Sequence, residues 1–279
     1  MSTPEIIKIY SENNDFQYIE TLRRRREKRQ RHREFFIEGV RPINLALKHQ
    51  WTINAFVYAR EKGLSDWATH ILAQSRAQVH FELPLRLLEK LSNKSETSEL
   101  LALVAMPEDD LGRISVAGDM VVVVFDRPAS PGNLGTILRS CDALHAAGLI
   151  ITGHAVDLYD PETISASTGS LFAVPAVRLP SHKELLPWVE DLRERLGYVQ
   201  VVGSSEDAQA ELADHCFAFP LLLVVGNEKW GMSAGYQDLC DIVVNIPIYG
   251  SASSLNVASA TSIFLYEIDR QRRKIRASL

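Results

Sequence analysis

The sequence lacks the features of several protein classes. No apolar run approaches the ~18–20 residues that a membrane span needs, and the N-terminus has no basic-then-apolar secretion signal. The three cysteines, Cys141, Cys216 and Cys240, are widely spaced and form no CxxC pair or Cys/His cluster. We therefore expect a cytoplasmic protein with reduced, buried thiols, no metal and no membrane partner.

Common signatures of nucleotide-binding and hydrolytic sites are also missing. No GxGxxG follows an apolar run, which argues against an ordinary dinucleotide site. There is no GxxxxGK[ST] phosphate loop, no GxSxG nucleophile turn, and no histidine pair at metal-ligand spacing. The chemistry of this chain must therefore come from another arrangement.

Charge is distributed unevenly along the chain. The net charge of −5 by itself disfavours a nucleic-acid binder. Residues 23–33, RRRREKRQRHR, nevertheless contain seven Arg, one Lys and one Glu. A basic block on an acidic body attracts phosphates. A solvated helix face, a tail and a nuclear localisation signal are alternatives that this run leaves open.

The 279 residues are enough for two domains. Residues 1–33 are polar and predicted to be largely helical. Residues 34–107 alternate between strand-like and helical stretches, which predicts a small α/β domain. Residues 108–119 are acidic, contain glycine and form the predicted linker, and residues 120–279 form a second domain. The strands predicted in the first domain are 53–58, 79–81 and 101–105.

The second half contains short apolar runs rich in β-branched residues. These runs are 121–125, 148–151, 198–202, 221–225 and 242–246. Such runs are typical of strands buried on both faces of a parallel sheet. Helices are predicted between them: one carries the apolar stripe Leu134, Ile137, Leu138, Cys141 and Leu144, and the last runs from about Ser254 to Arg272.

Three of these runs are followed by loops rich in Gly, Pro, Asn and Ser. The loops read DRPASPGNLGTILRS after Phe125, GNEKWGMS after Val225, and PIYGSASSLNVASA after Ile246. Open α/β sheets bind ligands at the carboxyl ends of their strands. The three loops are therefore predicted to form a common site.

In order and spacing, the loops resemble the three signature motifs of the SpoU (TrmH-type) RNA 2′-O-methyltransferases of the SPOUT superfamily. The matching residues are Asn133, Gly135 and Arg139, then Gly226, Asn227, Glu228, Gly231 and Ser233, and finally Ile246, Pro247, Gly250, Ser254, Leu255, Asn256 and Val257. Residues 167–177 are similar to the segment that the family carries between its first two motifs. The basic run followed by FFIEGVRPINLAL is similar to the family's L30e-like substrate-binding domain. Two departures stand out: Lys229-Trp230 replaces the Gly that usually follows the motif glutamate, and residues 258–260 read Ala-Ser-Ala rather than Ser-Val-Ala.

The resemblance implies a fold and an activity. The fold is α/β, with a parallel sheet and a deep trefoil knot in the C-terminal SPOUT domain and a smaller L30e-like domain before it. The activity is 2′-O-methylation of an RNA ribose with bent S-adenosylmethionine, in a site shared across a homodimer. The N-terminal domain favours ribosomal over transfer RNA. A non-catalytic RNA-binding or ribosome-assembly factor, and a base methyltransferase, remain alternatives.

The resemblance assigns Arg139 to activation of the ribose 2′-hydroxyl. Arginine stays protonated, so we interpret it as a cation that clamps a phosphate and the developing oxyanion. A solvated surface arginine is the alternative. Asn133 is expected to contact the substrate or to hold Arg139, unless it only caps the helix that follows. Glu228 is expected to orient Asn133 or Arg139, unless it only complements a helix dipole. Ser254 and Asn256 complete the catalytic set. Asn256 is expected to hydrogen-bond the ribose or the cofactor carboxylate. The alternative for Ser254 is that it is only the N-cap of the last helix.

The cofactor-binding residues implied by the family are Gly226, Ile246, Leu255 and Asn256. A side chain at Gly226 would block backbone approach to the ligand, unless this is a plain turn glycine. Ile246 and Leu255 would flank the adenine, unless they are ordinary core. The RNA-binding residues are expected to be Arg23, Arg24, Arg25, Arg26, Lys28, Arg29 and Arg41. Asp126 and the pair Asp109-Asp110 are expected to be structural.

Overall fold

The fold was analysed in a computed structural model of the chain. It describes residues 4–61, 63–92 and 94–277. The first three residues of the predicted segment 1–33 and the last two of the predicted domain 120–279 lie outside them.

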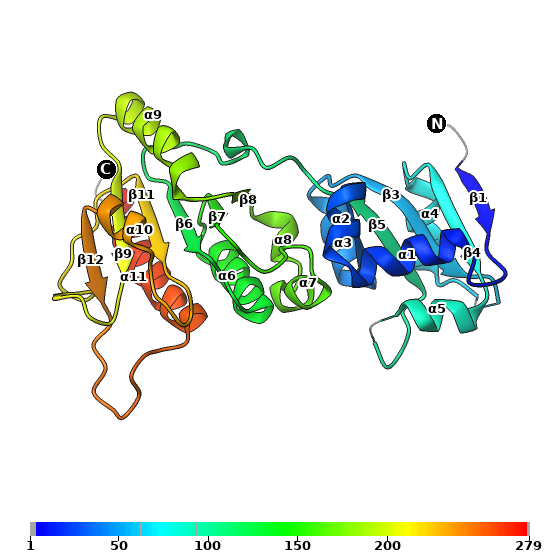
Figure 1. The fold of residues 1–279 in the computed structure, drawn as a ribbon. Coiled ribbons are helices and arrows are strands. Elements are labelled where there is room, and N and C mark those ends of the chain that lie inside the picture. The colour runs from blue at the N-terminus through cyan, green and yellow to red at the C-terminus, as the bar shows by residue number, and fades with distance from the viewer. Residues whose placement is uncertain (1–3, 62, 93, 278–279) are drawn as a thin grey trace. The chain divides into compact units, whose positions relative to one another are not determined.

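The chain divides into two compact units. Unit 1 comprises Met1–Pro107 and Tyr159–Phe172, and unit 2 comprises Glu108–Leu158 and Ala173–Leu279. Both units are drawn in Figure 1. Because Tyr159–Phe172 interrupts unit 2 along the sequence, the chain passes from one unit to the other three times.

Unit 1 is built on a five-stranded mixed sheet with the order β1-β4-β3-β5-β2. Its strands are β1 (Glu5–Lys8), β2 (Glu34–Glu38), β3 (Ile53–Ala59), β4 (Val79–Leu83) and β5 (Leu100–Ala105). β1, β4 and β3 run parallel, and β5 runs antiparallel to β3 and β2. The three strands predicted from sequence are confirmed. β1 lies in a segment predicted to be largely helical, but it extends along β4 and pairs with it residue for residue.

The basic N-terminal segment is part of the core of unit 1. The helices of this unit are α1 (Asn14–Arg24), α2 (Arg26–His32), α3 (Val40–Lys48), α4 (Asp66–Gln74), α5 (Leu85–Leu91) and α7 (Pro161–Ser167). Asn13 begins α1 by accepting a hydrogen bond from the Phe16 amide at 3.0 Å. Phe16, Ile19 and Leu22 repeat at helical spacing and are buried in the main cluster of the unit. The segment is therefore neither a tail nor a freely solvated helix.

Arg29 lies inside the protein, in contrast to the surface position that binding RNA would require. Its side chain is 2% exposed. Its guanidinium donates to the carbonyls of Leu22 at 3.0 Å and Arg23 at 2.8 Å, and reaches Asp160 at 3.4 Å. Arg29 thus satisfies the carbonyls at the end of α1, which have no partner within the helix. Of the other basic residues singled out, Arg24, Arg25, Arg26 and Arg41 are exposed, whereas Arg23 and Lys28 are partly buried.

Aromatic packing binds Tyr159–Phe172 into unit 1. The Tyr159 ring lies 4.7 Å from that of Phe35, and the Phe172 ring lies 5.3 Å from that of Trp51. The Trp51 indole also donates to the Phe172 carbonyl at 3.0 Å. These contacts explain why the segment groups with residues far from it in sequence.

Unit 2 contains a seven-stranded sheet with the order β10-β12-β9-β11-β6-β7-β8, in which every pairing is parallel. Its strands are β6 (Val121–Asp126), β7 (Gly148–Thr152), β8 (Ala176–Leu179), β9 (Gln200–Ser204), β10 (Ala210–Glu211), β11 (Leu221–Val225) and β12 (Ile242–Asn245). β6, β7 and β11 are buried along their whole length. The parallel sheet predicted from apolar runs is confirmed, and the short strands β8 and β10 were missed.

Helices flank this sheet. They are α6 (Pro131–Ala143), α9 (Leu186–Leu196), α10 (Ala234–Leu239) and α11 (Val257–Ala277). The short helix α8 (Ser170–Ala173) belongs to unit 1 except for its last residue. The stripe predicted on α6 is buried at Leu134, Ile137, Leu138 and Cys141, and only Leu144, at the cap, is partly exposed. α6 packs against α11 (Figure 1), where the Ser140 and Ser262 hydroxyls lie 2.7 Å apart.

The predicted linker is fixed to unit 2. It forms a short 3₁₀ turn at Leu111–Arg113, and Asp109 accepts from the Arg178 amide and guanidinium at 3.0 and 2.7 Å. Cys141 is buried, Cys240 is partly buried and Cys216 is exposed, so the expectation of buried thiols is wrong for Cys216. None of the helices in the described ranges is long and apolar enough to span a membrane. Within the same ranges, no group of three or more His, Cys, Asp or Glu residues could hold a metal ion.

Candidate active site

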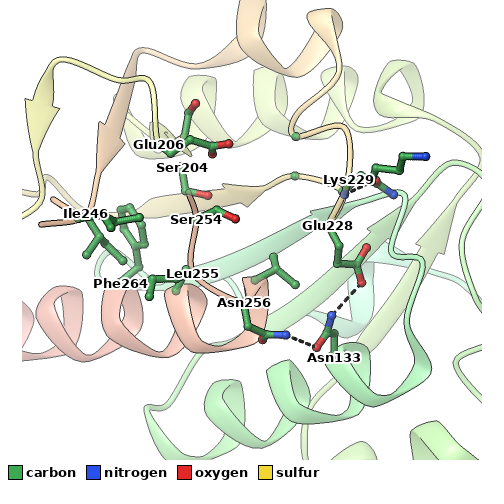
Figure 2. Close-up of a pocket in the computed structure, with 17 residues that line it drawn as sticks. Asn133, Ser204, Glu206, Glu228, Lys229, Ile246, Ser254, Leu255, Asn256 and Phe264 are labelled. Carbon is green, nitrogen blue, oxygen red and sulfur yellow. Dashed lines mark hydrogen bonds between the residues drawn. The ribbon is translucent and has the colours of Figure 1, made fainter. Parts of the chain in front are cut away.

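A cavity of about 280 Å³ opens in unit 2, where β9, β11 and β12 end. It is lined by Asn133, Ser204, Ser205, Glu206, Gly226, Asn227, Glu228, Lys229, Gly231, Ile246, Ile248, Ser254, Leu255, Asn256, Val257, Ala260 and Phe264. Figure 2 shows these side chains around the opening. The three loops predicted to form a common site therefore do so, since each contributes residues to this one cavity.

A chain of hydrogen bonds joins the three loops (Figure 2). The Glu228 carboxylate accepts a hydrogen bond from the Asn133 side-chain amide at 3.2 Å, and Asn133 Oδ1 accepts one from the Asn256 side-chain amide at 3.0 Å. Glu228 also accepts from the backbone amides of Ala129 at 2.9 Å and Ser130 at 3.0 Å, just before α6. The loop after β11 is thereby tied to the start of α6, and the start of α6 to the start of α11.

Asn256 rather than Ser254 begins the last helix. Asn256 Oδ1 accepts from the amides of Ala258 at 2.9 Å and Ser259 at 3.3 Å, which is the geometry of an N-cap. α11 consequently starts at Val257, three residues later than predicted, and continues to Ala277. Ser254 is left exposed at the cavity, with its side chain available to a ligand.

Gly226 is required by the folding of its own loop. A Cβ atom here would lie 2.8 Å from Gly231 Cα and closer still to the Gly231 carbonyl carbon and the Met232 nitrogen. The loop folds back on itself because Asn227 and Gly231 exchange backbone hydrogen bonds of 3.0 and 2.9 Å. The sequence predicts close approach of a ligand to Gly226, whereas the atoms nearest to an added Cβ are main-chain atoms of this loop.

Asp126 and Arg127 hold the other side of this loop. The buried Asp126 carboxylate accepts from Arg127 Nε at 3.0 Å and from the Ser233 amide at 2.8 Å. Its hydrogen bond to the guanidinium raises the pKa of Arg127, which keeps this side chain cationic. Arg127 also donates to the Gly231 carbonyl at 3.1 Å. Asp126 is therefore structural, as expected.

The far wall of the cavity is apolar. Ile246 is partly buried, Leu255 is 38% exposed, and Phe264 of α11 lies beneath them. Figure 2 shows Ile246, Leu255 and Phe264 on one side of the cavity. This wall suits a flat apolar ring, and the carboxylates and amides elsewhere in the cavity suit a polar remainder.

Sequence reasoning missed Ser204, Ser205, Glu206 and Phe264. Ser204 is the last residue of β9 and Ser205 and Glu206 follow it, so the rule about carboxyl ends of parallel strands could have found them. They escaped notice because this loop lacks the glycines and prolines that mark the other three. Phe264 gave no signal beyond its helical spacing.

Arg139 is the one predicted catalytic residue that does not line the cavity. It lies on the exposed face of α6, six residues beyond Asn133. At ~1.5 Å per residue, its Cα is about 9 Å farther along the helix. Among the described residues it has no hydrogen-bond or ion-pair partner, unlike Asn133, which bonds to Glu228 and Asn256 rather than to Arg139.

Comparison with known proteins identifies relatives over almost the whole chain. The profile of the SpoU rRNA Methylase family matches residues 120–266, and that of the SpoU L30e-like domain matches residues 13–102. A 23S rRNA (uridine(2479)-2'-O)-methyltransferase of Streptomyces viridochromogenes is 46% identical over 97% of this chain and 94% of its own length. A 23S rRNA (guanosine(2553)-2'-O)-methyltransferase, RlmP of Bacillus subtilis, is 29% identical over 84% of this chain and 88% of its own length.

A solved structure with a similar fold carries a ligand. The crystal structure of the SpoU methyltransferase AviRb from Streptomyces viridochromogenes, in complex with the cofactor AdoMet, superposes with a TM-score of 0.88 at 46% identity. The match covers 94% of this chain and 98% of that chain.

Proposed function

Because the chain belongs to the SpoU rRNA methylase family, we propose that it transfers the methyl group of S-adenosylmethionine to a ribose 2′-hydroxyl of 23S ribosomal RNA. The observation that carries this proposal is the hydrogen-bonded chain Glu228–Asn133–Asn256 at the mouth of one cavity. It joins residues from all three family motifs in a single site. A ribosomal RNA substrate supports the cytoplasmic location that the sequence predicts.

The cavity has the chemistry that S-adenosylmethionine requires. When bound, the cofactor supplies an electrophilic methyl group on a sulfonium. Ile246, Leu255 and Phe264 offer an apolar wall to the adenine, and the Glu206 carboxylate can accept from the ribose hydroxyls. Asn256 and Ser254 lie at the exposed edge, where they can bond the amino acid portion. Gly226 keeps the loop after β11 folded at this position.

Arg139 is the residue that we assign to the attacking oxygen. A protonated guanidinium stabilises negative charge on the 2′-oxygen and on the neighbouring phosphate. Asn133 and Glu228 act as positioning residues, because they fix the start of α6, the helix that carries Arg139. Since Arg139 lies outside the cavity of its own chain, we propose that a second copy supplies it.

The proposed homodimer has a candidate surface on α11. Ile263 and Tyr266 lie one helical turn apart and are 42% and 56% exposed. Burying such side chains is a common source of dimer stability. The deep trefoil knot that the family resemblance implies is part of the same proposal, since the loops after β11 and β12 would form it.

Methyl transfer to in vitro-transcribed 23S ribosomal RNA tests the function. Tritiated S-adenosylmethionine should label the RNA. The phosphodiester bond that follows the labelled nucleotide should resist alkaline cleavage, because a methylated ribose lacks the free 2′-hydroxyl. Label on a base, in RNA that alkali still cleaves at the labelled nucleotide, would indicate a base methyltransferase. RNA binding without any labelling of ribosomal or transfer RNA would indicate a non-catalytic binding factor.

Two basic residues of unit 1, Arg24 and Arg29, should differ in what their replacement by alanine changes. Arg24→Ala removes an exposed cation and should make the slope of log affinity against log salt less steep by about 0.7–0.9. Its effect on the free energy of unfolding should stay within about 0.5 kcal/mol, because it loses only an exposed ion pair with Glu20. Arg29→Ala removes a buried guanidinium that bonds two carbonyls and Asp160. It should lower the free energy of unfolding by about 2–4 kcal/mol.

Urea unfolding and salt-dependent RNA binding measure the two effects. The experiment compares Arg24→Ala and Arg29→Ala with the wild type under the same conditions. An Arg29→Ala protein of wild-type stability would contradict the structural role, and an unchanged salt slope for Arg24→Ala would contradict its contact with phosphate.

A further inference from the structure

We propose that Trp230 stacks on an unpaired nucleobase beside the target ribose and thereby positions the RNA for methyl transfer. This inference rests on the proposed function. The inference concerns the pair Lys229-Trp230, where the second motif departs from the Gly that usually follows its glutamate.

Trp230 is exposed at the edge of the cavity. Its side chain is 70% exposed, although the residues on either side of it, Lys229 and Gly231, both line the cavity. It is two residues from Glu228, so its Cα lies within about 7 Å of the Glu228 Cα. A nucleotide whose ribose enters the mouth of the cavity therefore has a neighbouring base within reach of the indole.

The loop holds Trp230 in place before any RNA is bound. Asn227 Oδ1 accepts from the backbone amides of Lys229 at 2.9 Å and Trp230 at 3.0 Å. The Asn227 side-chain amide donates to the Arg127 carbonyl at 2.6 Å, which anchors the turn to the loop after β6. Because the backbone is fixed in advance, stacking on the indole orders only its two side-chain torsions.

Lys229 gives the indole a polar setting that suits RNA. Its ammonium lies 4.6 Å from the centre of the Trp230 ring, in a cation–π contact that covers one face. The other face is left to a base, and the ammonium can meet the phosphate that accompanies it. Aromatic rings with adjacent cations are a common platform for unpaired bases.

A protein partner fits these surroundings less well. The neighbours of Trp230 in the loop are Asn227, Glu228 and Lys229, all polar, whereas the exposed apolar side chains Ile263 and Tyr266 lie together on α11. We therefore expect a second copy of the chain to pack against α11 and the RNA to contact Trp230.

Four proteins test the role of the ring. Trp230→Leu keeps an apolar side chain without a ring, Trp230→Phe keeps a smaller ring, and Trp230→Ala removes both. Tyr198→Ala is the matched control, because Tyr198 is also an exposed aromatic residue (47%) but precedes β9, at the opposite end of the strand from the cavity.

Steady-state methylation of 23S ribosomal RNA separates binding from chemistry. Trp230→Ala and Trp230→Leu should raise KM for RNA about 5- to 100-fold, the range expected from loss of one stacked base. Trp230→Phe should be intermediate, and KM for S-adenosylmethionine should not change. Tyr198→Ala should behave as the wild type. A Trp230→Leu enzyme with wild-type KM for RNA would overturn the proposal.

Fluorescence provides a direct signature. The fluorescence emission of Trp230 is obtained by subtracting the emission spectrum of Trp230→Phe from that of the wild type. RNA should quench this emission on binding. Absence of quenching would overturn the proposal, as would dissociation of the dimer by Trp230→Ala in sedimentation, which would assign the ring to a protein interface. A wild-type enzyme that labels no ribose would refute the proposed function, while Trp230-dependent quenching could still be measured.

Discussion

Replacing Arg139 by alanine is expected to lower kcat for RNA methylation by about 10²–10³-fold, the cost of losing one group that stabilises a developing oxyanion. Stability should not change, because Arg139 is exposed and, in the described part of the chain, bonds to no other residue. Affinity for S-adenosylmethionine should also be retained, because the role proposed for Arg139 is at the attacking oxygen rather than at the cofactor. Single-turnover methylation, calorimetry with the cofactor and urea unfolding measure the three quantities.

Mixing two inactive variants shows which chain supplies Arg139. Leu255→Asp places a charge in the apolar wall and should prevent cofactor binding, while Arg139 remains intact. Co-refolded with Arg139→Ala, it should restore about a quarter of the wild-type rate, because half of the dimers are mixed and each holds one complete site. No recovery from confirmed mixed dimers would show that Arg139 acts within its own chain. Wild-type activity of Arg139→Ala alone would remove it from the mechanism.

Replacing Gly226 by alanine is expected to abolish measurable cofactor binding and to lower the free energy of unfolding by about 3 kcal/mol or more. The added methyl group overlaps the main chain of Gly231 and Met232, which cannot move aside as a flexible side chain would. Opening this turn would break the backbone pairing of Asn227 with Gly231 and displace Glu228 from the amides before α6.

Gly118→Ala is the matched control for this substitution. A Cβ at Gly118 meets nothing within 4 Å, so the same chemical change should leave stability and cofactor affinity as they are. Calorimetry and thermal unfolding of the two variants give the comparison. A Gly226→Ala protein that binds S-adenosylmethionine with wild-type affinity would contradict the close-packed turn.

The sequence predicts the sheet of unit 2 well because a strand buried on both faces is recognisable from its own residues. Runs such as Val121–Phe125 and Leu221–Val225 are apolar at every position, and this pattern does not depend on which strands lie beside them. The polar loops that follow them are equally visible. The end of β9 and the loop after it are not visible, because Ser204 and Glu206 acquire their place only from the parallel register of β9 with β11 and β12.

Features that depend on contacts between distant residues were not predicted. Arg29 resembles its basic neighbours in sequence, and only the end of α1 and Asp160 distinguish it. The strand β1 has only four residues, too few to show a strand pattern, and it extends because β4 offers a free edge. The hydrogen bonds that Asn133 donates to Glu228 and that Asn256 donates to Asn133 were among several partnerships that the residue types allowed.

The threefold passage of the chain between its units has a consequence for dissecting the protein. A fragment that begins at Glu108 would carry Tyr159 and Phe172 without Phe35 and Trp51, exposing aromatic surface that the intact chain covers. A fragment that ends at Pro107 would lose the same rings from its own interior. Unit 1 is therefore not a continuous segment of the chain, and grafting it onto a relative would have to bring residues 159–172 with it.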